Sequence, residues 1–157
     1  MSIEEMKTEI LKDLFHSYAN ESDTAVYSIG EIVKKHNGDP QEVGQYLVRN
    51  GWVNNPMPRG TDFGCSIVLQ GIMEIDPDYV PKYESKIIST LGELGGQKMS
   101  LLEVLDFPAV KLQSARHLAD WFQEIGLIEV LYSAGDGSIS LTMEGMDYYQ
   151  KNKPSFF

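Results

Sequence analysis

Residues 117–149, HLADWFQEIGLIEVLYSAGDGSISLTMEGMDYY, hold the pattern that decides the fold. Apolar residues at three- and four-residue steps predict a helix, and Gly126 ends it because glycine readily adopts the left-handed backbone of a helix C-terminus. Two strand-like runs, 127–132 and 138–141, flank a Gly-Asp-Gly turn and predict a β-hairpin. Thr142 is placed to cap a last helix. The stretch therefore predicts the order helix, hairpin, helix.

The residues before this stretch predict two more helices. Ser100 is a candidate cap for a short helix over 101–105, and the turn over 106–108 leads into the longer helix, which runs to about Ile125. An earlier amphipathic helix ends at the glycine pair 95–96, and its apolar residues are Tyr83, Ile87, Ile88, Leu91 and Leu94.

The first half of the chain follows the same plan. Helical periodicity covers 3–18, Ser28 precedes a short helix over 29–36, and the Asp-Pro pair at 39–40 begins a helix that runs to Asn50. LVRNGWV aligns with FQEIGLI so that the glycines of the two halves correspond at an offset of 75 (126 − 51).

The first hairpin is less regular than the second. Residues 54–62 are rich in proline and predict a long loop, and 64–69 returns as a strand. The end of that strand, 69–71, lacks the Leu-Thr-x-x-Gly spacing of 141–145.

The boundary between the halves is expected at EIDPDYVP, 74–81, because two prolines within five positions discourage a continuous helix. We expect a first domain over 1–76, a linker over 77–82, a second domain over 83–152 and an aromatic tail over 153–157.

This order of elements resembles the winged-helix family, in two tandem copies. The second half is the better match, over roughly 85–150: residues 114–128 resemble the recognition helix and first wing strand of bacterial winged-helix regulators, and 141–145 resembles their exit from the wing. The resemblance implies a mainly α fold with small β-wings, an α+β protein of tandem winged-helix domains. Such domains bind DNA, RNA or other proteins, so the fold alone does not choose among these functions.

Composition argues against non-specific nucleic-acid binding. The chain has 157 residues, 42% of them hydrophobic, and a net charge of −10. Residues 1–80 hold 6 basic and 13 acidic side chains, and 81–157 hold 7 and 10. The amino terminus lacks the pattern of a signal peptide, and no apolar run approaches ~18 residues, so we expect a soluble, cytoplasmic protein without a membrane segment.

The residues of common catalytic and metal sites are absent as motifs. Cys65 is the single cysteine and is expected to be a buried apolar residue. The three histidines are far apart, and no nucleophile elbow or phosphate-binding loop occurs. We therefore expect no enzyme activity, no catalytic residue, no cofactor and no metal.

Polar residues on the outer face of the longer helix are the leading candidates for DNA contacts. They are Lys111, Gln113, Arg116 and His117, with Gln41, Gln45, Arg49 and Arg59 as secondary candidates in the first half. Arginine suits guanine and glutamine suits adenine in the major groove. The alternative is an ordinary solvated helix face. Asp120 and Glu124 would repel phosphates, and Asp136 at the second wing disfavours insertion there.

Aromatic residues supply candidates for an interface. These are Trp121, Tyr148, Tyr149, Phe156 and Phe157. Trp121 suits packing between the two halves, or a contact with a partner or a second copy.

Two functions follow from these features. The first is a DNA-binding, transcription-linked regulator that recognises double-stranded DNA, either as a built-in pseudo-dimer or as a homodimer with half-sites ~34 Å apart. The alternative is an acidic adaptor that binds a protein partner through winged-helix domains without touching nucleic acid.

Overall fold

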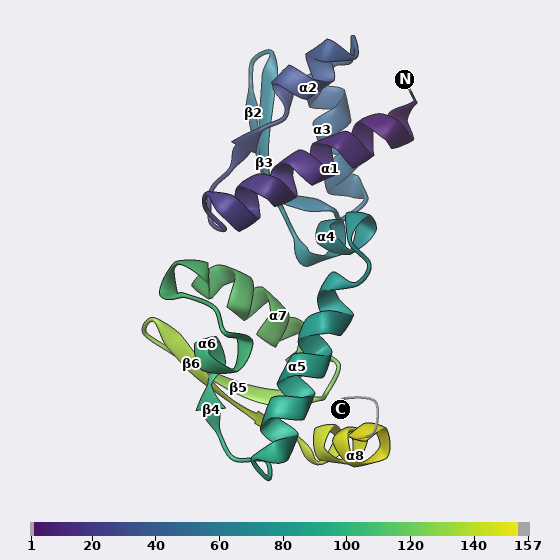
Figure 1. Ribbon diagram of the computed structural model, residues 1–157. Helices are drawn as coiled ribbons and strands as arrows, with labels where there is room; N and C mark the ends of the chain where they lie inside the picture. The colour runs from purple at the N-terminus through teal and green to yellow at the C-terminus, as the bar shows by residue number, and fades with distance from the viewer. Residues whose placement is uncertain (1, 154–157) are drawn as a thin grey trace. The chain divides into compact units, whose positions relative to one another are not determined.

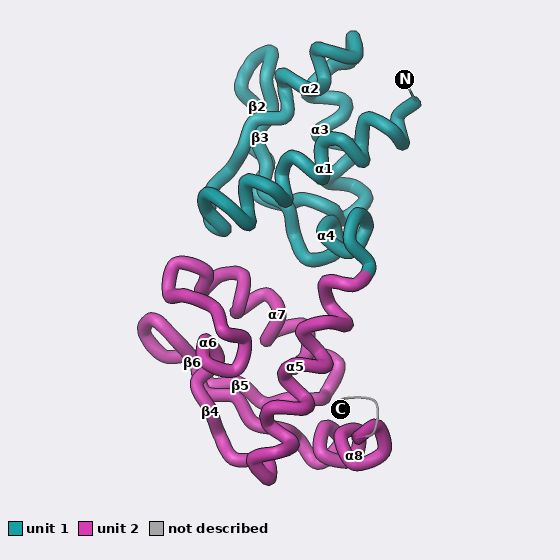
Figure 2. The backbone as a smooth tube through the Cα atoms, viewed as in Figure 1, with its two compact units in different colours: residues 1–77 teal, residues 78–157 magenta. Residues whose placement is uncertain are grey.

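The computed structural model describes residues 2–153 and has an α+β architecture with two small antiparallel sheets, each of three strands (Figure 1). The chain divides into two compact units, residues 1–77 and 78–157 (Figure 2).

Unit 1 places three helices before a hairpin and one helix after it. Its elements are α1 (Ile3–Asn20), β1 (Tyr27–Ser28), α2 (Gly30–Lys35), α3 (Pro40–Arg49), β2 (Val53–Arg59), β3 (Asp62–Ile67) and α4 (Leu69–Ile75). The short β1 pairs with β3, so the sheet order is β1-β3-β2.

Unit 2 repeats this order with one added turn. Its elements are α5 (Tyr79–Glu93), β4 (Met99–Ser100), α6 (Leu101–Leu105), the 3-10 turn η1 (Ala109–Lys111), α7 (Leu112–Glu124), β5 (Ile128–Ser133), β6 (Asp136–Leu141) and α8 (Met143–Asn152). Its sheet order, β4-β6-β5, is that of unit 1.

The local signals that set these elements act as predicted. Asp39, Ser100 and Thr142 each accept a hydrogen bond from a backbone N–H in the first turn of the helix they cap. Gly51 and Gly126 have φ values of 74° and 88°, the left-handed conformation expected after a helix. The predicted second hairpin is confirmed as β5 and β6.

Each unit has its own apolar core. In unit 1 the fully buried side chains include Ile10, Leu11, Leu14, Leu47, Phe63 and Ile72, and in unit 2 they include Ile87, Ile88, Leu91, Leu101, Phe122 and Ile139. The two residues at which the third helices were expected to end are not buried: Asn50 is exposed, and Ile125 is 50% exposed. Both lie at the C-cap position, where the helix ends and its periodicity no longer sets the direction of the side chain.

The expected linker over 77–82 is mostly helical. Helix α5 begins at Tyr79, so Pro81 is its third residue. Proline is tolerated there because the first N–H groups of a helix have no partner within the helix. Helix α5 therefore begins four residues before residue 83, the expected start of the second domain.

The first hairpin has a two-residue turn at 60–61 in place of the long loop expected over 54–62. Strand β2 runs to Arg59 because proline is tolerated in an edge strand. The pairing steps from Asn54–Ser66 to Met57–Gly64, so two residues of β2 stand opposite one of β3. This bulge adds one residue to the first hairpin.

The segments that follow the two hairpins correspond to each other, but the extra residue of the bulge shifts their alignment by one position. Helix α4 was not predicted, yet Gly71 is its third residue, as Gly145 is in α8. A Cβ on Gly71 would lie 2.2 Å from the carbonyl oxygen of Trp52, and a Cβ on Gly145 would lie 2.1 Å from that of Leu127. Ile-Val-x-x-Gly over 67–71 thus corresponds to Leu-Thr-x-x-Gly at an offset of 74 (145 − 71). The expectation that the first half lacks this spacing is wrong.

Candidate nucleic-acid interface

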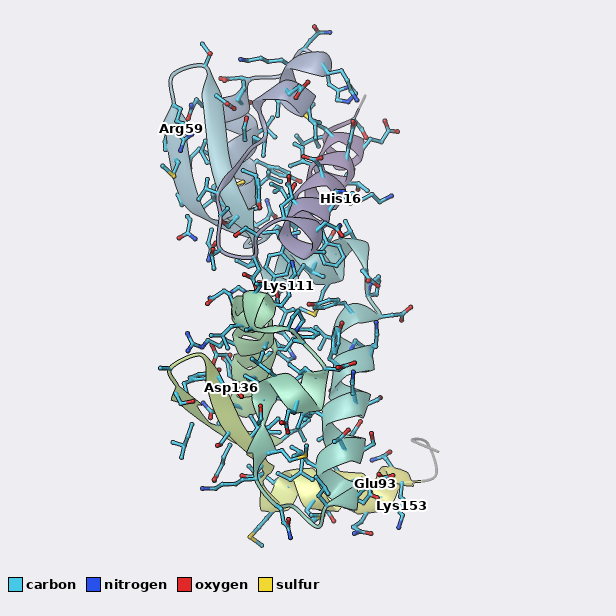
Figure 3. The ribbon with its side chains drawn as sticks, turned by 60° about the vertical axis from the view of Figure 1, so that its left-hand side comes forward. His16, Arg59, Glu93, Lys111, Asp136 and Lys153 are labelled. Atoms are coloured by element: carbon cyan, nitrogen blue, oxygen red, sulfur yellow. The ribbon has the colours of Figure 1, made fainter. Side chains whose placement is uncertain are left out.

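Helix α7 and the turn before it carry the four leading candidates, and all four are half-buried. Lys111 ends η1 at the amino-terminal end of α7 (Figure 3). Gln113 and His117 lie one turn apart, and their Nε2 atoms are 3.0 Å from each other. Because the amide and the imidazole bond to each other, they offer less to a DNA base than two free side chains would.

Arg116 binds the hairpin of its own unit. Its Nη2 donates to the carbonyl oxygen of Ser133 at 3.3 Å, and its guanidinium carbon lies 5.1 Å from the centre of the Tyr132 ring. The Tyr132 hydroxyl, which has one proton to donate, lies within hydrogen-bond distance of both the Arg116 carbonyl oxygen and the Asp120 carboxylate. Burial, and then the nearby Asp120, raise the pKa of Tyr132 well above its usual range. This cluster holds α7 against β5.

The fully exposed side chains of α7 are negative or neutral. Asp120, Gln123 and Glu124 are exposed, and the Gln123 side-chain oxygen accepts the outward N–H of Val130 at 2.9 Å. A helix that presents two carboxylates repels the phosphates on either side of a DNA groove.

Gln41 in unit 1 binds the hairpin of its own unit, as Arg116 does in unit 2. The two residues correspond at the offset of 75 (116 − 41). Its Nε2 donates to the carbonyl oxygens of Gly60, at 3.1 Å, and Asp62, at 2.5 Å. In each unit a long polar side chain at this position therefore helps to fix the hairpin to the third helix. Neither side chain can reach a DNA base without releasing its bond to the hairpin.

Gln45, Arg49 and Arg59 are exposed on unit 1. Gln45 and Arg49 lie one turn apart on α3. Arg59 ends β2, and its Nη2 is 3.7 Å from the sulfur of Met57 (Figure 3). These three are the predicted DNA-contact residues that remain available.

A serine and an aspartate join each hairpin to the short strand beside it. The Ser28 hydroxyl lies 2.8 and 2.7 Å from the two carboxylate oxygens of Asp62, and the Ser100 hydroxyl donates to one carboxylate oxygen of Asp136. The Ser28 bond is the main cause that lowers the pKa of Asp62. Burial acts to raise the pKa of Asp136, but bonds from Ser100 and from the N–H groups of Gly137 and Leu102 lower it.

Asp136 therefore turns back toward the start of α6 (Figure 3), where it accepts from Leu102 N–H at 3.2 Å. The hairpin turn itself is Ala134 and Gly135, and Asp136 is the first residue of β6. The expectation that Asp136 disfavours insertion of this hairpin into DNA stays a prediction. These serine–aspartate pairs were not predicted from the sequence. The signal was present: a serine one or two positions before each short helix and an aspartate directly after each hairpin turn.

Of the aromatic interface candidates, one belongs to the core. Tyr149 is 3% exposed and packs on Gly92, where an added Cβ would lie 2.3 Å from its ring. Tyr148 is half-buried, and its hydroxyl donates to Glu84 at 2.9 Å. Trp121 is half-buried. Phe156 and Phe157 lie outside the described residues.

Burial accounts for Cys65, which lies in β3 and has its pKa raised to about 12 by desolvation. Among residues 2–153, no three His, Cys, Asp or Glu side chains are grouped closely enough to hold a metal ion. None of the helices in this described range combines the length and apolar character that a membrane span requires.

Comparison of the chain with protein-family models, with curated proteins and with solved structures gave no match.

Proposed function

We propose that this chain is a tandem winged-helix protein. The support is the order helix, short strand, helix, helix, two strands, helix in both units, with the short first strand beside the last one. The shared devices at equivalent places strengthen the proposal: the glycine after the third helix, the serine–aspartate pair and the glycine at the third position of the last helix.

We further propose that it is a non-enzymatic adaptor that binds a protein partner. One observation carries this proposal: the side chains best placed to read bases are used inside each unit. Arg116 and Gln41 hold the wings, and Gln113 pairs with His117. Winged helices that read DNA leave such side chains free to contact base edges.

The charge of each unit supports the same proposal. Unit 1 has 6 basic and 12 acidic residues, a net charge of −6, and unit 2 has 7 and 11, a net charge of −4. A protein that neutralises several DNA phosphates needs a local excess of Lys and Arg. The exposed face of α7 carries the opposite charge.

A DNA-binding regulator is the second candidate, and unit 1 favours it. Gln45, Arg49 and Arg59 are exposed on α3 and at the end of β2. In this alternative, α3 would lie in the major groove and Arg59 would contact the backbone or the minor groove.

Selection from a randomised duplex library tests the proposal. The full chain is incubated with the library at low salt, beside a variant in which Gln45, Arg49 and Arg59 are all changed to Ala. The adaptor proposal predicts that neither protein enriches a motif. A motif enriched by the wild type and lost in the variant, with affinity that falls steeply with salt, would overturn the proposal in favour of the regulator.

A further inference from the structure

An exposed corner forms in unit 2 where α7 ends and α8 begins. Thr142 joins the two ends: its hydroxyl donates to the Gly126 carbonyl oxygen at 2.6 Å, and its N–H donates to that of Leu127 at 3.1 Å. The residues flanking this junction are Glu124 and Ile125 at the end of α7 and Met143 and Glu144 at the start of α8, and we call these four the α7–α8 corner.

The two apolar residues of the corner are exposed to solvent. Ile125 is 50% exposed and Met143 is 91% exposed. Leaving a large apolar side chain in water forgoes the stabilisation that burial would supply, about 1.5–3 kcal/mol for a fully buried one. Neither residue is needed at the surface to end or cap a helix, because Gly126 and Thr142 do this.

The two acidic residues lie beside them. A Cβ on Gly126 would be 2.8 Å from the Glu144 carboxylate, so this carboxylate reaches across to the end of α7. Glu144 is favoured in the first turn of α8 by the helix dipole, but Glu124 ends α7, where the same dipole disfavours a negative charge. Within the described residues, neither carboxylate has an ion-pair partner. Capping and helix stability therefore do not account for Glu124.

Unit 1 shows the same backbone junction with different side chains. Arg49 and Asn50 end α3, and Leu69 and Gln70 begin α4. The Gln70 side chain lies near Gly51 as Glu144 lies near Gly126, and Leu69 is only 8% exposed. The junction in unit 1 carries one positive charge and no exposed large apolar side chain. The corner in unit 2 carries two negative charges and two such side chains.

We propose that the α7–α8 corner docks a segment of a partner protein that carries Lys or Arg next to an apolar side chain. Charge complementarity selects the cationic segment, because Glu124 and Glu144 are carboxylates that form no ion pair with residues 2–153 and lie beside two exposed apolar side chains. Ile125 and Met143 supply the contact that excludes water, and methionine adapts to differently shaped partners. This proposal rests on the adaptor function and names its surface and the chemistry of its partner.

A displayed library of random peptides tests this assignment on the full chain. The key variant, Glu124→Arg with Ile125→Asn and Glu144→Gln, gives three of the four corner positions the side chains that unit 1 carries there. A second variant, Met143→Ser, removes the more exposed of the two apolar side chains and keeps both carboxylates. The matched control changes Arg49 and Gln70 to Ala at the junction of unit 1. Circular dichroism and the urea midpoint check that each variant is folded.

The proposal predicts that the wild type enriches peptides with Lys or Arg beside an apolar residue. Both corner variants should bind them at least about tenfold more weakly, and the unit 1 control should bind them as the wild type does. Equal binding by the corner variants, or no enrichment of basic peptides, would overturn the assignment of the corner. The duplex selection separately decides the adaptor function, so the two proposals fail in distinguishable ways.

Discussion

Replacing Gly44 by alanine tests whether unit 1 requires a glycine beside Phe63. Gly44 lies in α3, and an added Cβ would be 2.3 Å from Cδ1 and 2.4 Å from Cγ of the Phe63 ring. Phe63 is fully buried, so its ring cannot move away into solvent. At the corresponding positions, unit 2 has Ala119 on the helix and Gly137 on the strand. The glycine of this contact therefore lies on the helix in unit 1 and on the strand in unit 2.

The magnitude is the difference between two opposed effects. Alanine improves helix propensity by about 1 kcal/mol relative to glycine. Overpacking a buried site costs about 1–3 kcal/mol, and a contact more than 1 Å too short lies toward the upper end of that range. We expect Gly44→Ala to lower the free energy of unfolding of unit 1 by about 1–2 kcal/mol.

Each unit contains one of the two tryptophans, Trp52 and Trp121, which makes the assay specific. In a Trp121→Phe background, the fluorescence of Trp52 follows the unfolding of unit 1 in urea. With a slope of about 1–2 kcal/mol/M, the midpoint should fall by roughly 1 M. Gln45→Ala, on the exposed face of α3, is the control and should change the stability by less than about 0.5 kcal/mol.

A double-mutant cycle separates the steric contact from other effects. Phe63→Leu removes ring atoms that the new Cβ would meet, so the double variant should be more stable than the sum of the single effects predicts, by about 1 kcal/mol. A stabilising or neutral Gly44→Ala, or strictly additive effects, would refute the argument that Phe63 demands glycine at this position.

Three further outcomes are expected. Gly145→Ala should destabilise unit 2 by about 2 kcal/mol or more, because its Cβ would meet the Leu127 carbonyl oxygen, a backbone atom that cannot rotate away. Trp121 fluorescence during urea unfolding measures this change, and an unchanged midpoint would contradict it. Cys65, with its pKa raised to about 12 by burial, should react with a thiol reagent at pH ~8 only when unit 1 unfolds; rapid labelling of the folded protein would show that it is accessible. Hydrogen bonds from Lys35 and then His36 lower the pKa of Glu9 below 4.5. Its stabilising effect is therefore present above that value and is lost as pH falls through the lower folded pKa. Glu9→Gln should remove that part of the acid sensitivity, which urea midpoints at several pH values would measure.

Much of the secondary structure was predictable because its signals are local. Helical periodicity, the caps at Asp39, Ser100 and Thr142, and the left-handed glycines at 51 and 126 act through backbone atoms a few residues away. The predicted element boundaries were wrong where the effect of a proline depends on the element that contains it. Prolines predicted a loop in β2 and a linker at the start of α5, but an edge strand and a first helical turn both lack the hydrogen bond that proline cannot donate.

The surface chemistry of the third helices could be predicted only in part. Helical spacing placed Arg116, Gln113 and Gln41 outside the apolar stripe, yet long polar side chains fold back onto whatever lies beside them. Arg116 and Gln41 reach the hairpins, which are about twenty residues away along the chain. Helical periodicity gives the direction of a side chain from its own helix, but it does not show that a hairpin lies within its reach.

The sequence by itself determined two copies of one order of elements, because caps, glycine stops and apolar spacing depend on neighbouring residues. Only the tertiary structure decided which polar side chains face solvent, because their hydrogen-bond partners come from other elements. It also placed Ile125, Met143 and two carboxylates together at one corner. That corner exists because Thr142 bonds to the carbonyl of Gly126, a contact between residues 16 positions apart.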